Sequence, residues 1–89
     1  MKAVISVIGK DAVGILAKVS GKCFDGGINV TDVTQSILQD MFVMIMMVEF
    51  SEKSIPFSEF DNAMAELGKK EGLVIHVMNY EIFQAMHKI

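Results

Sequence analysis

Two short segments carry the residue types that could bind a small charged molecule. Asp11-Ala12-Val13-Gly14 opens a predicted helix, and Gly27-Ile28-Asn29-Val30 opens a predicted strand. Backbone N–H groups at a helix start favour a carboxylate, and Gly14 has no Cβ to keep a ligand away. Asn29 can both donate to and accept from an ammonium or amide group. A small amino acid fits this set, although a helix start and a turn would explain the same residues without a ligand.

The spacing of Gly9 and Gly14 matches the two glycines of a phosphate-binding loop. That loop also needs a lysine and a serine or threonine directly after the second glycine, to reach phosphate and hold Mg²⁺. Ile15 and Leu16 occupy these positions. The sequence therefore gives no support for nucleotide hydrolysis.

Side chains for metal binding or covalent catalysis are few and scattered. Cys23 falls on the apolar stripe of a predicted helix, which is typical of a buried core thiol. His76 lies inside a predicted strand and His87 near the C-terminus, so no Cys-x-x-Cys or His-x-x-x-His pair exists. No nucleophile, base and orienting group stand out together. We expect no metal site, no cofactor and no catalytic residues, and hence a protein that is not an enzyme.

Composition narrows the class of protein further. The chain has 89 residues, of which 52% are apolar, so it is one ordered domain. Eight lysines and no arginine stand against 11 acidic residues, for a net charge of −3, which argues against nucleic-acid binding. A single cysteine cannot form an intramolecular disulfide, and the apolar run at the N-terminus is too short for a signal peptide or membrane span. We therefore expect a cytoplasmic protein that contacts no membrane.

The hydrophobic periodicity predicts seven elements in the order βαββαβ, followed by a C-terminal helix. They are a strand over 3–8, a helix over 12–25, strands over 28–38 and 41–48, a helix over 56–70, a strand over 73–78 and a last helix over 80–87. Asp11 is the predicted N-cap of the first helix, and one glycine of Gly26-Gly27 is predicted to end it in a left-handed conformation. This order predicts an α+β, ferredoxin-like sandwich: a four-stranded antiparallel sheet with two helices on one face, plus the short C-terminal helix.

In the second predicted strand, the apolar residues change from one face of the strand to the other partway along. Ile28 and Val30 fall on one face, whereas Val33 and Ile37 fall on the other. A β-bulge near Thr31-Asp32 would bring all four side chains to the same face.

The first, third and fourth predicted strands are apolar on both faces. The third, 41–48, is wholly apolar and contains four of the eight methionines, which suits a central strand covered on both sides. Two helices can cover only one face of the sheet. The other must be covered by the C-terminal helix, by a second subunit, or by both.

Both glycine-containing segments resemble those of the ACT domain, a βαββαβ ligand-binding module. The family's first turn is Asp-x-x-Gly followed by two apolar residues, as in Asp11, Gly14, Ile15 and Leu16, and its second strand begins Gly-x-Asn-Ile, close to Gly27-Ile28-Asn29-Val30. Further positions are similar to the ACT domains of the glycine-cleavage-system repressor and formyltetrahydrofolate deformylase: Asp32, Gln35, Phe42 and Met44. The whole chain is similar to a stand-alone ACT family, with 79–89 as a C-terminal helical extension of a single domain, 1–89.

The resemblance implies regulation or sensing rather than catalysis. In ligand-binding ACT domains an amino acid often sits between the first turn of one subunit and the second strand of its neighbour. At the matching positions of this sequence, the resemblance implies that the first part of the site comprises Asp11, Ala12, Val13, Gly14 and Ile15. The second part comprises Asn29 and Val30. The resemblance thus implies a homodimer or higher homo-oligomer with an amino-acid effector. The signal passes either to an unidentified protein partner or into a change of the oligomer itself. A ligand-free module for protein interaction or oligomerisation is the alternative.

Overall fold

The computed structural model describes residues 1–10 and 13–86. Its elements follow the expected order: β1 (Lys2–Gly9), α1 (Ile15–Asp25), β2 (Asn29–Leu38), β3 (Met41–Glu49), α2 (Phe57–Glu71), β4 (Val74–Asn79) and α3 (Tyr80–Met86). Every predicted strand and helix is present, with ends shifted by a few residues.

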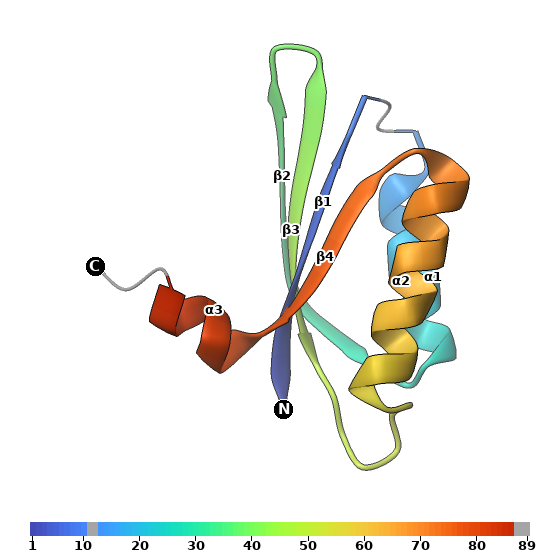
Figure 1. Ribbon diagram of the computed structural model, residues 1–89, viewed down its shortest axis with the longest axis vertical. Helices are drawn as coiled ribbons and strands as arrows, with labels where there is room; N and C mark the ends of the chain where they lie inside the picture. Colours follow the sequence, from blue (N-terminus) through green and yellow to red (C-terminus); the bar gives the residue numbers. More distant parts are fainter. Residues whose placement is uncertain (11–12, 87–89) are drawn as a thin grey trace.

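The four strands form one antiparallel sheet in the order β2-β3-β1-β4. Helices α1 and α2 lie together on one face, and α3 projects away from the opposite face (Figure 1). Helix α1 contacts β2, whereas α2 packs mainly on β4. The predicted α+β, ferredoxin-like sandwich is confirmed.

Strand β2 contains the predicted bulge. Val30 lies opposite Val48 and Asp32 lies opposite Met47, so Thr31 is the extra residue. Its hydroxyl donates to the carbonyl oxygen of Met47 over 3.2 Å. Because of this insertion, Val30 and the later Val33 both face the helices.

Helix α1 begins three residues later than predicted. Its N-cap position is held by Gly14, with a left-handed φ of +72°, and its first residue is Ile15. The prediction that Asp11 caps this helix is therefore wrong, and Asp11 itself lies outside the described residues. At the other end, Gly27 has a φ of +70°, so the predicted left-handed residue after α1 is confirmed.

The core lies between the helices and one face of the sheet. β1 contributes alternate residues, and the helices contribute the stripes expected from their spacing. The most completely buried side chains are Ile5, Val7, Val19, Cys23, Met44, Met46, Val48, Phe60 and Met64. Phe60 meets Phe50 edge to face, with ring centroids 5.6 Å apart, which closes the core at the end of β3.

Within one chain the opposite face of the sheet is only partly covered, so its coverage by a second subunit stays a prediction. Phe42, Met44, Met46 and Val48 are buried under the helices, whereas the alternating residues from Met41 to Met47 are half-buried. Helix α3 lies beside β1 and β4, with Phe83 next to Val4 and Met78. Among residues 1–10 and 13–86, no element lies over β2 and β3 on this side (Figure 1).

Candidate functional site: two half-sites at opposite ends of α1

The first half-site is the turn between β1 and α1. Gly14 adopts a left-handed conformation that a residue with a side chain rarely adopts, and its carbonyl accepts from the N–H of Lys18 over 3.0 Å. Val13 is 82% exposed, and Ile15 points into the core. No described side chain caps the first turn of α1, and that turn holds no acidic residue. Its backbone N–H groups therefore suit a carboxylate.

An ion pair that the sequence analysis missed stands beside this turn. The Lys18 ammonium on α1 donates to the Glu71 carboxylate at the end of α2 over 2.6 Å. The hydrogen bond from Lys18 holds the pKa of the Glu71 carboxyl below its ordinary value. The two residues are 53 positions apart, so no local sequence pattern could have paired them. The pair ties α1 to α2 next to the first half-site.

A cleft of about 290 Å³ opens at the same end of the sheet. Its lining includes Gly9 and Lys10 at the end of β1, Met41 at the start of β3, and Glu71. The cleft therefore places a cation and a carboxylate on largely apolar walls, close to the predicted turn. Asp11 and Ala12, which complete that turn in the sequence, lie outside the described residues.

The second half-site is the start of β2. Asn29 is exposed and lies opposite Glu49 of β3, while Val30 is half-buried on the helix side. The chain that leads into this strand is fixed by the loop after β3. The Ser54 hydroxyl donates to the carbonyl of Gly27 over 2.7 Å, and the N–H of Ile55 donates to the carbonyl of Gly26 over 2.9 Å. Asn29 therefore lies at the start of a strand whose preceding residues are held by two hydrogen bonds.

Within one chain the two half-sites do not meet. Helix α1, which separates them, has 11 residues, a length of about 16 Å at the usual rise. The strand register agrees: Asn29 and Lys2 are both level with Glu49 at one end of the sheet, whereas Gly9 is level with Phe42 at the other. A ligand that touched both half-sites would need a second copy of the chain.

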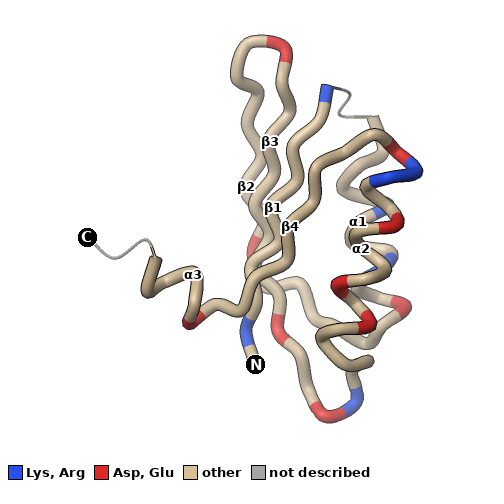
Figure 2. The backbone as a smooth tube through the Cα atoms, viewed as in Figure 1, with Lys and Arg blue, Asp and Glu red and all other residues tan. Residues whose placement is uncertain are grey.

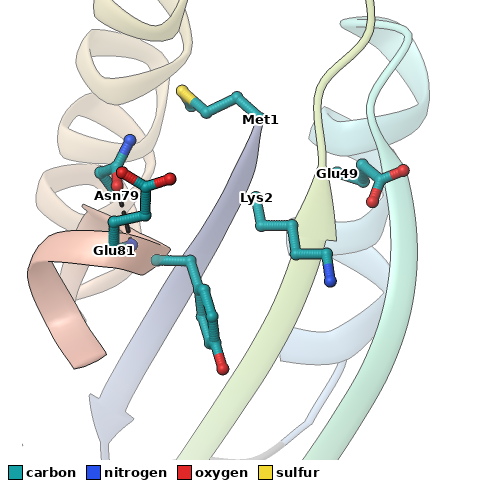
Figure 3. Close-up of a pocket in the computed structure, with 6 residues that line it drawn as sticks. Met1, Lys2, Glu49, Asn79 and Glu81 are labelled. Carbon is teal, nitrogen blue, oxygen red and sulfur yellow. Dashed lines mark hydrogen bonds between the residues drawn. The ribbon is translucent and has the colours of Figure 1, made fainter.

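A larger cleft, of about 600 Å³, lies at the same end of the sheet as Asn29 (Figure 3). It is lined by Lys2 and Glu49 from adjacent strands and by Asn79, Tyr80 and Glu81 where β4 passes into α3, with Met1 at its edge. The Lys2 ammonium lies 5.9 Å from the centre of the Tyr80 ring. The Asn79 side chain accepts from the backbone N–H of Glu81 over 2.8 Å, which starts α3. The charged side chains that line this cleft are exposed, so we interpret the cleft as a polar rim rather than an enclosed site.

The remaining candidates for chemistry, Cys23 and His76, lie on opposite sides of the sheet. Cys23 is fully buried, and burial raises the pKa of its thiol to about 11, so the prediction of a core cysteine is confirmed. His76 is exposed on the partly covered face. Among residues 1–10 and 13–86, no three His, Cys, Asp or Glu side chains gather closely enough to hold a metal ion. Within the same residues, no helix has the length and apolar character needed to span a membrane.

The order of the elements and the four-stranded antiparallel sheet define a ferredoxin-like α+β domain. A sequence profile of the ACT domain matches residues 2–78. A UPF0237 protein of Listeria monocytogenes is 49% identical, with full coverage of both chains. The solved ACT domain protein from Streptococcus pneumoniae is 37% identical and superposes with a TM-score of 0.83 over 98% of each chain.

Two larger proteins share the fold at low sequence identity. A putative glycine cleavage system transcriptional repressor has a TM-score of 0.74 at 21% identity, and this chain spans 43% of its length. A formyltetrahydrofolate deformylase from Pseudomonas putida has a TM-score of 0.77 at 12% identity, with 29% of its length covered. The chain therefore belongs to the ACT domain family, and the relatives that it matches over their whole length include UPF0237 proteins. ACT domains in general are regulatory and bind small molecules.

Proposed function

We propose that the protein is a cytoplasmic amino-acid sensor that acts as a homo-oligomer and catalyses no reaction. Its ligand lies between the first turn of one copy, Asp11 to Ile15, and the start of β2, Asn29 and Val30, of another. Ligand binding tightens this assembly and so changes either the oligomer itself or a protein partner that recognises it.

The observation that carries the proposal is the direction of the free edge strand. Strand β2 has ten residues and, within the part of the chain that the structure describes, one neighbouring strand, β3. Both β1 and β2 run antiparallel to β3, so they run parallel to each other. If two copies pair their β2 strands antiparallel about a two-fold axis, the start of one β2 lies near the end of the other. That end of the sheet also holds the first turn, and α1 lies on the β2 side.

The paired half-sites match the chemistry of a free amino acid. The N–H groups at the start of α1 favour its carboxylate, and the amide oxygen of Asn29 can accept from its ammonium group. Gly14 has space for a ligand, since among the described residues beyond its chain neighbours a Cβ built there meets the side chain of Lys18 alone, at 3.9 Å. We expect a small effector, such as glycine or serine, to fit best.

Thermal unfolding with each of the twenty amino acids at millimolar concentration tests the proposal. A ligand at about 100 times its Kd stabilises the folded state by roughly 2.7 kcal/mol, a shift of several degrees for a domain of this size. We expect a selective shift in the wild type and in Asn62→Ala, which removes an exposed asparagine of α2. The shift should vanish in Asn29→Ala. If Asn29→Ala keeps the full shift, the proposed site is wrong.

A ligand-free interaction module is the second candidate. It is favoured by the partly covered, apolar face of the sheet, which a sensor site at the ends of α1 does not require. A stable oligomer that no amino acid stabilises would support this candidate over the sensor.

A further inference from the structure

Another cavity lies between helix α3 and the sheet, outside both half-sites. It has a volume of about 280 Å³ and is lined by Val4, Ser6, His76, Met78 and Phe83. None of these residues belongs to the turn before α1 or to the start of β2. The proposed amino-acid site therefore does not account for this cavity.

The strand register determines the floor of the cavity. Val4 of β1 lies opposite Met78 of β4, and Ser6 lies opposite His76. Residues directly opposite each other in an antiparallel pair project to the same side of the sheet, and so do residues two apart on one strand. Here that side is the one away from α1 and α2 (Figure 1). The floor therefore combines two apolar side chains with two polar ones.

Helix α3 adds an aromatic ring to the lining. Its first turn is joined to β4, because the Asn79 side chain accepts from the backbone N–H of Glu81 over 2.8 Å. The helix contacts both β1 and β4. Phe83 is half-buried, whereas its neighbours Ile82 and Gln84 are exposed. Phe83 is thus the side chain by which this helix faces the cavity.

Among the described residues, no lysine, aspartate or glutamate lines the cavity. Figure 2 shows the charged residues mainly on the helices and toward the ends of the strands. Within residues 1–10 and 13–86, neither the Ser6 hydroxyl nor the His76 ring forms a hydrogen bond. Both groups can therefore bond a ligand, whereas a charged ligand would lose hydration without gaining a counter-ion. The lining favours a neutral molecule with a polar atom.

The volume and the ring determine the size and shape of that molecule. An apolar cavity of about 150 Å³ binds benzene, so a cavity of about 280 Å³ suits a bicyclic ring. The Phe83 ring can stack on such a ring or meet it edge to face. The thioether of Met78 also makes favourable contacts with aromatic rings. An aliphatic molecule of the same size would gain neither contact.

We propose that this cavity binds a neutral bicyclic aromatic molecule that carries a hydrogen-bonding group, a ring N–H or a hydroxyl. The ring system contacts Phe83 and Met78, and its polar group bonds to Ser6 or His76. This site is independent of the proposed amino-acid sensor. A free amino acid is a zwitterion, whose two charges need partners that this cavity does not offer.

Indole is the probe for this site, and the Met78 methyl group is the reporter. In protein isotopically labelled at its methionine methyl groups, indole should shift the Met78 signal saturably, with a Kd of about 1 mM or lower. Met46 and Met64 are fully buried in the core, so their signals should move little and report that the fold is intact. A Met78 signal that does not shift saturably would overturn the proposal.

Two pairs of variants locate the binding. Ser6→Leu fills the cavity and should abolish the Met78 shift. Ser36→Leu adds the same side chain on the same side of the sheet, at an exposed position of β2, and should bind indole like the wild type. Phe83→Ala should weaken binding about tenfold or more, whereas Ile82→Ala, at an exposed position, should change it less than about twofold. Wild-type affinity in Ser6→Leu would overturn the site.

Two further molecules test the chemical class of the ligand. N-methylindole has no N–H to donate and should bind about fivefold more weakly, which is the effect of one lost hydrogen bond. Tryptophan carries the indole ring on a zwitterion and should leave the Met78 signal in place. Equal affinity for N-methylindole, or a tryptophan shift equal to that of indole, would overturn the proposed class.

The same spectra separate this inference from the proposed function. Glycine and serine should leave the Met78 signal in place, whether or not Asn29 binds them. If indole shifts Met78 and no amino acid stabilises the protein, the cavity site is supported and the sensor is not. The reverse result would support the sensor and overturn the cavity site.

Discussion

The two faces of the sheet are made by the same strands, yet they differ in what covers them. Along β3, Met44 and Met46 are fully buried under the helices, whereas Ile45 and Met47, one position on, are only half-buried. Both sets are apolar, so composition does not separate them. The difference arises because α1 and α2 lie over one face only. It shows that the monomer uses one apolar face of the sheet for its core and leaves the other partly exposed.

The largest expected effect comes from a matched pair of neighbours on β3. Met46→Ala removes a fully buried side chain and should lower the free energy of unfolding by about 2–5 kcal/mol. Ile45→Ala, on the partly covered face of the sheet, should lower the free energy of unfolding by about 1 kcal/mol when the protein is dilute enough to be monomeric. Urea unfolding at low and high protein concentration measures both.

The stability costs of the two variants should also differ in how they depend on protein concentration. The cost of Ile45→Ala should grow with protein concentration, because association then contributes to the stability of the wild type. The cost of Met46→Ala should depend on concentration much less. Equal costs for the two variants at every concentration would show that the faces do not differ in role.

Because Cys23 is buried under the helices, the free energy of unfolding should also depend on alkaline pH. Burial raises the pKa of the Cys23 thiol to about 11, whereas an unfolded chain gives about 8.5. Between these values the unfolded thiol ionises and the folded one does not. Stability should therefore be unaffected by this group below about pH 8.5, and between there and about pH 11 it should fall with a slope approaching about 1.4 kcal/mol per pH unit.

Cys23→Ala is the control for the pH range in which only the unfolded thiol ionises. The alanine variant starts less stable, but its stability should fall less steeply with pH than that of the wild type. Parallel slopes in urea unfolding from pH 8 to 10 would mean that the thiol is not protected by the core.

The smallest expected change in stability comes from breaking the ion pair between Lys18 and Glu71, which joins the two helices. Glu71→Gln should reduce stability slightly at pH 7, and added salt should shrink this loss because the pair is partly exposed. The lowered pKa of Glu71 means that its contribution is present above its ordinary pKa and is lost as the pH falls through the lowered value. Glu66→Gln, an exposed position on the same helix, is the control. Identical losses in both variants at all salt concentrations would contradict the pairing.

The candidate site was predictable only in its separate parts. The positions of Gly14 and Asn29 at the start of a helix and of a strand followed from local pattern, within a few residues. The start of α1 was misplaced because Asp11 has the side chain of a common N-cap, whereas the chain uses the backbone freedom of Gly14. The pairing of Lys18 with Glu71 could not be found, since it depends on how two helices pack.

The sequence by itself determined the order of the elements, the apolar stripes of both long helices and the bulge in β2. These features arise from periodicity and turn chemistry, which are local along the chain. Only the tertiary structure decided which sheet face the helices cover and that Gly14 and Asn29 lie at opposite ends of α1. Both depend on strand order and direction, which are set by contacts between distant residues. For the same reason, the chain alone holds two half-sites, and joining them requires a second copy.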